Sequence, residues 1–332
     1  MEKNMKTKNY QTIKKIILVL AIIVAAILIA GSIAKANLAK KFPAPGQLVD
    51  VGGYQMHIYC TGQGSPTVML EAGSGDSSLI WAKVQPKIAE FTRVCSYDRA
   101  GLGWSDPSPY PRTANTMVEE LHTLMLTAKI DGPYVFVGHS LGGMLVRMYA
   151  HKYPDDISGM VLVDSLHEAR MIRNPDLAEA IQEATGQFRM LAFLNSIGIM
   201  ALAPQAIPTL GLPADTNKRY QALMASTDAL ATWLAELKMG KENCAEALAM
   251  QINSFGDLPL VVISAGHGES LASFSDAENQ QLWENMQIEQ TDLVALSSQG
   301  KQIIAEKSGH HIQLDQPELV IDAIRQVIEV IQ

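Results

Sequence analysis

Residues 134–149, YVFVGHSLGGMLVRMY, decide the fold of this chain. The first four are apolar and predict a short buried strand, whereas residues 144–149 have the apolar spacing of a helix. Between them lies Gly138-His139-Ser140-Leu141-Gly142, a G-x-S-x-G sequence. Strand, G-x-S-x-G and helix in this order are typical of a nucleophile elbow, a sharp turn that exposes a serine at a helix N-terminus.

The surroundings of the pentapeptide make it informative. A serine has glycine at both flanking positions about once in 200 by chance, so the five residues alone carry little weight. Here the two glycines suit a turn in which a Cβ would clash with the neighbouring strand or helix. The unpaired amides and the dipole of the following helix would favour negative charge that develops beside Ser140.

Composition limits the classes of function. The chain has 332 residues, 48% of them hydrophobic, which is enough for one large core. Its net charge of −8 is uneven, because residues 1–41 carry +7 and residues 42–332 therefore carry −15. An acidic globular part argues against nucleic acid as a partner. The sequence has neither H-E-x-x-H nor clustered Cys and His, and no G-x-x-x-x-G-K-[ST], so we expect no metal and no cofactor.

The N-terminus has the pattern of a membrane anchor. Residues 16–34 form an almost unbroken apolar run long enough to span a bilayer. Five lysines precede the run and three follow it, which favours residues 1–15 as a cytoplasmic basic tail. Residues 35–45 would then be a linker, and residues 46–332 a domain outside the cytoplasm in a single-pass membrane protein. The alternative is secretion after cleavage of a signal peptide near Ala34-Lys35-Ala36.

Strand and helix patterns alternate through the rest of the chain. This alternation predicts an α/β fold with a mostly parallel sheet covered by helices on both faces. Residues 165–256 lack strand patterns and are rich in Ala, Leu and Met at helical spacing. The predicted strands are residues 47–51, 54–60, 67–70, 93–97, 134–137, 159–163, 258–264 and 302–305, and the main helices are residues 81–91, 113–129, 144–149, 275–297 and 318–331.

A base and an acid are expected on loops at the carboxyl ends of strands. His310 follows the last strand, and Gly309 before it gives the histidine room to turn inward, which favours it over His311. Asp164 ends the strand after the elbow helix and is the favoured acid, although it could also be a helix cap. The alternative acid is Glu269, after the next strand.

Two backbone amides are candidates for an oxyanion hole. One is that of Leu141, directly after the serine. The other is that of Ser74, because Gly73-Ser74-Gly75 suits close approach of a backbone to a ligand. We interpret His139 and Asp98 as structural residues.

These motifs resemble those of the α/β-hydrolase superfamily of esterases and lipase-like enzymes, over about residues 46–332. The matching pieces are GHSLGG at 138–143, YDRAGLGWSD at 97–106, AGSG at 72–75 and GHHIQLDQPELV at 309–320. The resemblance implies an eight-stranded α/β-hydrolase fold with a helical cap at about residues 165–256. The order Ser140, Asp164, His310 agrees with the family's order of nucleophile, acid and histidine.

The chain departs from the family pattern in two places. Ala72-Gly73 replaces the common His-Gly start of the oxyanion loop, and the usual acid after the penultimate strand is missing. Some relatives place the acid one strand earlier, where Asp164 lies. The family's sheet order also implies that strands 54–60 and 93–97 are neighbours. A disulfide between Cys60 and Cys95 would follow, with Cys244 free.

The resemblance implies hydrolysis of carboxylic esters through an acyl-enzyme with a Ser-Asp-His triad. The Met- and Leu-rich cap suggests a small substrate with an apolar acyl or alcohol group. Serine at the elbow argues against dehalogenase and epoxide-hydrolase chemistry, for which relatives use aspartate there. Proline-iminopeptidase-like, thioesterase and acyltransferase activities stay open, as does a catalytically silent, membrane-tethered binding protein. Nothing in the sequence indicates the oligomeric state.

Overall fold

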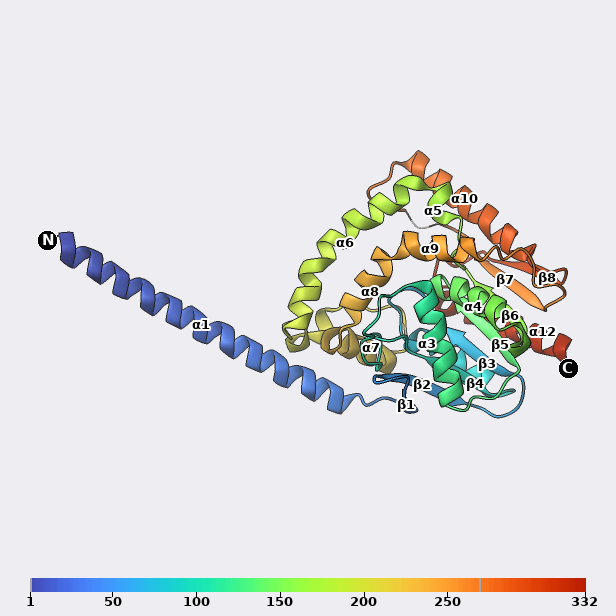
Figure 1. Ribbon diagram of the computed structural model, residues 1–332, viewed down its shortest axis with the longest axis horizontal. Coiled ribbons are helices and arrows are strands. Elements are labelled where there is room, and N and C mark those ends of the chain that lie inside the picture. The colour runs from blue at the N-terminus through green and yellow to red at the C-terminus, as the bar shows by residue number, and fades with distance from the viewer. Residues whose placement is uncertain (1, 269) are drawn as a thin grey trace.

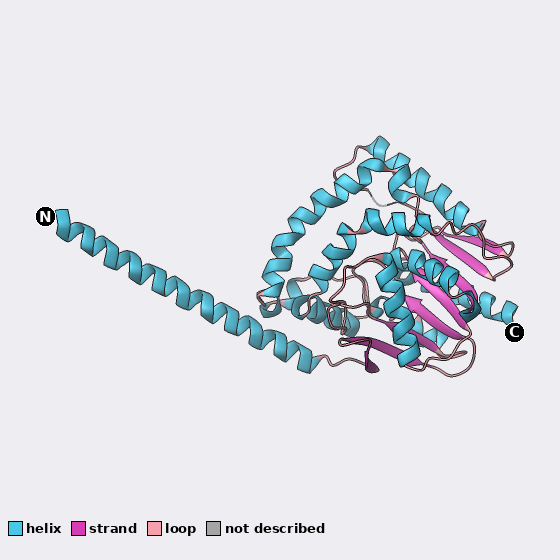
Figure 2. Ribbon diagram, viewed as in Figure 1, coloured by secondary structure: helices cyan, strands magenta, loops and turns pink. Residues whose placement is uncertain are grey.

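An eight-stranded sheet forms the centre of the computed structural model, which describes residues 2–268 and 270–332 (Figures 1 and 2). Its strands are β1 (Gln47–Asp50), β2 (Gln55–Thr61), β3 (Thr67–Glu71), β4 (Val94–Tyr97), β5 (Tyr134–His139), β6 (Ile157–Val163), β7 (Leu260–Ala265) and β8 (Gly300–Ala305). The order is β1-β2-β4-β3-β5-β6-β7-β8. Strands β1 and β2 pair antiparallel, β2 joins β4 antiparallel, and the other pairs are parallel. The α/β-hydrolase fold expected from the sequence is confirmed.

Helices cover both faces of this sheet. The α-helices are α1 (Glu2–Lys41), α2 (Gln85–Ile88), α3 (Ala114–Thr127), α4 (Leu141–Lys152), α5 (Arg170–Arg173), α6 (Pro175–Ser196), α7 (Ala214–Ser226), α8 (Ala229–Lys238), α9 (Gly240–Ala249), α10 (Asp276–Val294), α11 (Ile312–Asp315) and α12 (Pro317–Ile331). Side chains of the strands alternate between two cores. In β5, Phe136 packs with α3, α4 and α10, whereas Val135 and Val137 pack with α2 and α12.

The cap lies between β6 and β7 in the sequence. Helices α5 to α9 form it, and Figure 1 shows α6, α8 and α9 beyond one end of the strands. Parallel strands end together, so the loops after β3, β5, β6 and β8 meet beneath these helices.

Helix α1 is longer than the predicted membrane span. It continues past Ala34 through the predicted linker to Lys41, because Ala, Leu and Lys favour helix and the first breaker is Pro43. Within the described residues it is the one helix long and apolar enough to cross a bilayer, and its most apolar stretch of 18 residues has a mean hydropathy of 3.2. In Figure 1 it projects away from the rest of the protein.

The predicted helix over residues 81–91 is wrong as a single element. A 3₁₀ turn at Ser78–Trp81 is followed by the separate one-turn helix α2. Pro86 lies in the first turn of α2 and cannot donate a backbone hydrogen bond, so it starts a helix rather than continuing one.

Strands β2 and β4 lie side by side as the family's sheet order implied. Cys60 is opposite Cys95 in their register, and the two form a disulfide. Cys244 is a buried free thiol.

Candidate active site

Ser140 occupies a strained turn between β5 and α4. Its backbone has φ 53° and ψ −122°, a conformation that L residues rarely adopt. Both glycines of the pentapeptide are required by close packing. A Cβ on Gly138 would lie 2.6 Å from the Gly142 carbonyl oxygen, and a Cβ on Gly142 would lie 2.5 Å from that of Ala72. The turn therefore holds the serine at the start of α4, as the elbow pattern predicts.

Asp164 and His310 meet beside this turn. Asp164 directly follows β6, and its Oδ2 lies 2.6 Å from Nδ1 of His310, which comes from the loop after β8. The other carboxylate oxygen accepts a 3.2 Å hydrogen bond from the amide of Ala265. The Asp164 side chain is almost completely buried, whereas that of His310 is 30% exposed. The buried carboxylate thus fixes the orientation of a histidine that reaches the surface of the site.

The sequence offered His311 as a competitor of His310 and Glu269 as an alternative acid. His311 is directed elsewhere, because its Nε2 lies 3.9 Å from the carboxylate of Asp76. Glu269, the alternative acid, lies outside the described residues.

One cavity of about 300 Å³ brings the predicted residues together. Ser140, Asp164 and His310 all line it, as do Leu141 and Ser74. The rest of its wall is mainly apolar and comes largely from the cap and α10, including Leu166, Met171, Leu177, Ile181, Leu237, Leu271, Leu282, Trp283 and Met286. Among the described residues, no group of three or more His, Cys, Asp or Glu side chains could hold a metal ion.

The predicted oxyanion amides belong to two different elements. Leu141 is the first residue of α4, and the first amides of a helix have no acceptor within the helix. Ser74 lies on the loop after β3. Its hydroxyl donates a 3.0 Å hydrogen bond to Glu236, a residue of cap helix α8.

A buried cluster of charged residues holds the Ser74 loop, and sequence reasoning missed it. Arg99 donates from Nε to Glu236 at 2.8 Å and from Nη1 to Glu71 at 2.6 Å. It also donates to the carbonyls of Ala72 and Gly73 at 2.6 and 2.5 Å. Arg99 lies in the recognised 97–106 motif, but Glu236 stands in an Ala- and Leu-rich helix with no local sign of its role.

Burial and ion pairing affect the acids of this cluster differently. Burial raises the pKa of Glu71 to about 7, although the charge of Arg99 opposes the shift. Burial also acts to raise the pKa of Glu236, but the charge and hydrogen bonds of Arg99 outweigh it and hold that pKa below its usual value. Glu236 therefore carries a charge at neutral pH, and it accepts a further 2.8 Å hydrogen bond from the amide of Gly75. The cap is thereby tied to the Ser74 loop.

His139 and Asp98 have the structural surroundings we expected. Burial, together with the charges of His310 and His311, holds the pKa of His139 well below its usual value. Neutral His139 donates from Nε2 to the His310 carbonyl at 2.9 Å and so supports the histidine loop. Asp98 accepts hydrogen bonds from His57 and from the amides of Ser78 and Trp104.

Comparison with known proteins places this geometry in a family. The model of the alpha/beta hydrolase fold family matches residues 66–196, which include the Ser74 loop, the elbow and Asp164. Residues 66–196 therefore have the sequence of an α/β-hydrolase, and the domain around them has the α/β-hydrolase fold. Its fold is also that of the epoxide hydrolase CorEH, with a TM-score of 0.65, 18% identity, and coverage of 86% of this chain and 99% of that one.

Two curated relatives extend the match along the chain. The α/β-hydrolase is 29% identical to the uncharacterized protein YqjL of Bacillus subtilis, over 80% of this chain and 85% of that protein. It is also 29% identical to the probable transporter efuK of Hormonema carpetanum, over 85% of this chain. That match spans 42% of efuK, so the chain corresponds to less than half the length of that relative.

Proposed function

We propose that the protein cleaves carboxylic esters through an acyl-enzyme formed on Ser140. The observation that carries the proposal is the 2.6 Å hydrogen bond between Asp164 and His310 at a cavity that Ser140 also lines. The proposal assigns the nucleophile, the base and the orienting acid of acyl transfer to Ser140, His310 and Asp164, on the loops after β5, β8 and β6.

Each member of the triad has one task. His310 takes the proton from Ser140 Oγ as the oxygen attacks the ester carbonyl, and later gives it to the leaving alcohol. Asp164 keeps the proton of the imidazole on Nδ1 and stabilises the charged imidazolium. A water activated by the same histidine then releases the acid and restores the serine.

The amides of Leu141 and Ser74 bind the oxyanion in this mechanism. One lies at the positive end of α4, and the other is held by the cluster of Arg99, Glu71 and Glu236. Loss of one such donor typically costs about 10²–10³ in rate. The Leu- and Met-lined wall of the cavity favours a substrate with an apolar acyl or alcohol group.

We also propose that residues 16–34 of α1 anchor the enzyme in the cell membrane. Residues 1–15 are then the cytoplasmic tail, and residues 46–332 form the hydrolase domain outside, with its cap at about residues 165–256. The Cys60–Cys95 disulfide supports an oxidising compartment for the domain. A cleaved signal peptide would export the same domain without its anchor, and the N-terminal mass of the mature protein distinguishes the two outcomes.

The experiment is hydrolysis of p-nitrophenyl esters together with labelling by a fluorophosphonate probe. We expect the wild type to turn over the esters and to carry the label on Ser140, and Ser140→Ala to lose both. A folded wild type that hydrolyses no ester and leaves Ser140 unlabelled would refute the proposal and favour a binding protein on the same fold.

A further inference from the structure

The last turns of α6 and the turn after it carry four exposed apolar side chains. Met190 is 63% exposed, Leu191 41% and Phe193 57%, and Leu202 in the 3₁₀ turn that follows is 49% exposed. These four residues are called the α6 patch below. The outer face of a helix that meets water normally carries polar residues, and clustered exposed apolar side chains mark a surface that contacts another apolar phase.

The α6 patch adjoins helix α1. The loop after α6 touches α1 backbone to backbone, because a Cβ on Gly31 would lie 2.9 Å from backbone atoms of Gly198. Lys35 of α1 also donates a 3.3 Å hydrogen bond to the Ser196 carbonyl at the end of α6. In Figure 1, α1 leaves the protein on the side of the cap where α6 and α7 lie.

The position of this contact along α1 sets the depth of the patch. Gly31 is in the last turn of the apolar run that ends at Ala34, about 4.5 Å before its end at the helical rise. If residues 16–34 cross the hydrocarbon core, Gly198 lies at the boundary between the core and the headgroups. The neighbouring residues of the α6 patch then lie at the same boundary, where apolar side chains of a surface helix enter a bilayer.

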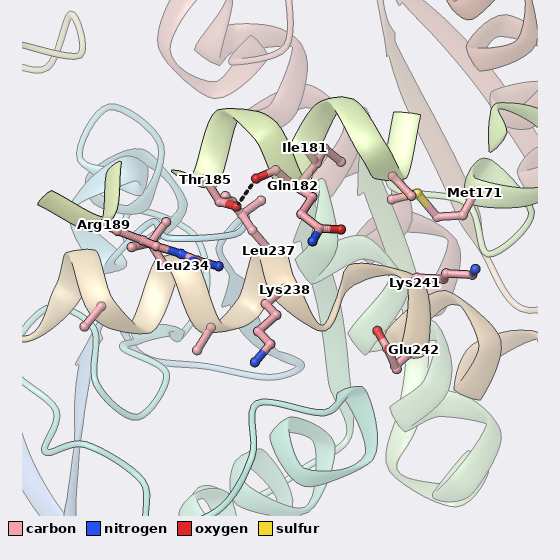
Figure 3. A pocket seen from close by; sticks show the side chains of 13 residues that line it. Met171, Ile181, Gln182, Thr185, Arg189, Leu234, Leu237, Lys238, Lys241 and Glu242 are labelled. Atoms are coloured by element: carbon pink, nitrogen blue, oxygen red, sulfur yellow. Dashed lines mark hydrogen bonds between the residues drawn. The ribbon is translucent and has the colours of Figure 1, made fainter. Parts of the chain in front are cut away.

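A second cavity leads from α6 toward the serine. It has a volume of about 620 Å³ and lies between α6 and α8 (Figure 3). Figure 3 shows Ile181, Gln182 and Thr185 of α6 facing Leu234 and Leu237 of α8 across it. It shares the lining residues Met171, Ile181 and Leu237 with the cavity that contains Ser140. The space beside α6 therefore adjoins the candidate active site.

We propose that the cap rests on the lipid bilayer through the α6 patch and that the substrate is an ester whose acyl chain comes from the membrane. This inference rests on the proposed esterase function. Helix α1 fixes the distance of the cap from the bilayer, the patch enters the interface, and the cavity between α6 and α8 receives the acyl chain on its way to Ser140.

The test uses the full-length protein in vesicles of phosphatidylcholine and phosphatidylglycerol. The variant Met190→Ser/Phe193→Ser/Leu202→Ser keeps α1 and therefore stays in the membrane. We expect its turnover of a fluorogenic diacylglycerol analogue in the vesicles to fall by about tenfold or more, and its turnover of water-soluble p-nitrophenyl butyrate to stay within about twofold. The matched control is Leu126→Ser on α3, which removes an apolar side chain of similar exposure, 65%, and should change neither rate. Unchanged turnover of the vesicle substrate in the triple variant would overturn the inference.

A second measurement does not depend on folding of the triple variant. An environment-sensitive fluorophore attached at Phe193→Cys should be quenched by spin-labelled lipids, and one at Leu126→Cys should not; the native Cys244 is buried. A water-exposed fluorophore at residue 193 in an enzyme that cleaves p-nitrophenyl butyrate would refute the membrane contact and leave the esterase function standing. A quenched fluorophore in a protein that cleaves neither ester would refute the esterase function and, with it, the substrate assignment.

Discussion

The substitution Glu236→Gln tests how the cap supports catalysis. It keeps the size of the side chain but removes the charge that Arg99 pairs with through Nε at 2.8 Å and through Nη2 at 3.1 Å. It also weakens the acceptor for the Ser74 hydroxyl and the Gly75 amide, at 3.0 and 2.8 Å. The substitution therefore affects the loop proposed to supply one oxyanion amide, without touching the triad.

The structure limits the expected loss of stability. Removing one partner of a buried ion pair typically costs about 3–5 kcal/mol. Arg99 keeps a second carboxylate, Glu71, at 2.6 Å, and the glutamine still offers an amide oxygen to the loop. We therefore expect the free energy of unfolding to fall by about 2 kcal/mol, near the value of one hydrogen bond to a charged group.

The effect on catalysis should be larger than the effect on binding. Displacement of the Ser74 loop by a fraction of an ångström to about 1 Å should lower kcat by about 10- to 100-fold. KM should change by less than about threefold, because the oxyanion forms only in the transition state. The assay is p-nitrophenyl butyrate hydrolysis, with urea unfolding measured on the same samples.

The control is Glu120→Gln, which weakens another buried ion pair and leaves the hydrogen bonds of Glu236 and Arg99 to the Ser74 loop in place. Glu120 accepts from Nη1 of Arg112 at 2.8 Å, and both side chains are 5% exposed. This variant should lose comparable stability and keep kcat. Wild-type kcat in Glu236→Gln, or an equal loss of kcat in Glu120→Gln, would refute the positioning role of Glu236.

Two further predictions concern Asp164 and His167. Asp164→Asn should lower kcat by about 10⁴-fold with little change in folding, because an amide no longer holds the required tautomer of His310. A loss below about tenfold in the same ester assay would point to another acid. Burial lowers the pKa of His167 to about 4, so between pH 4 and 6.5 the unfolded chain binds the extra proton and stability rises with pH. In His167→Gln the free energy of unfolding should rise by up to about 3 kcal/mol less than in the wild type over this pH range. Urea unfolding of both proteins at pH 4.5 and 7 measures this difference. An equal rise in the two proteins would refute the lowered pKa of His167.

Local patterns in the sequence were sufficient for the elbow and the sheet. The pattern around Ser140 combines a buried strand, two glycines and a helix, and each part is readable within a few residues. The strands are short apolar runs separated by turn residues, so they could be located in the sequence. Their order in the sheet then followed from the resemblance to the family. Asp164 could be proposed because it directly follows such a strand, and His310 because it lies on the loop after the last strand; the structure brings the two within hydrogen-bond distance. Their chemical roles stay predictions.

Contacts between distant segments could not be predicted in the same way. Arg99 and Glu236 are 137 residues apart, and the helix of Glu236 has the composition of ordinary packing. The end of α1 could not be predicted from the membrane span either, because the apolar run stops at Ala34 while helix-forming residues continue to Lys41. Hydrophobicity marks where a bilayer could end, and it does not mark where a helix ends.

The most direct test of the central claim is a crystal structure of the protein after reaction with a fluorophosphonate. We expect a covalent phosphonyl group on Ser140 Oγ, with its oxygen within about 3.1 Å of the amides of Leu141 and Ser74. We also expect His310 Nδ1 to keep its hydrogen bond to Asp164 in the adduct. A group attached elsewhere, or an adduct at Ser140 with the phosphonyl oxygen directed away from both amides, would refute the assignment of Ser140 as the nucleophile at this oxyanion hole.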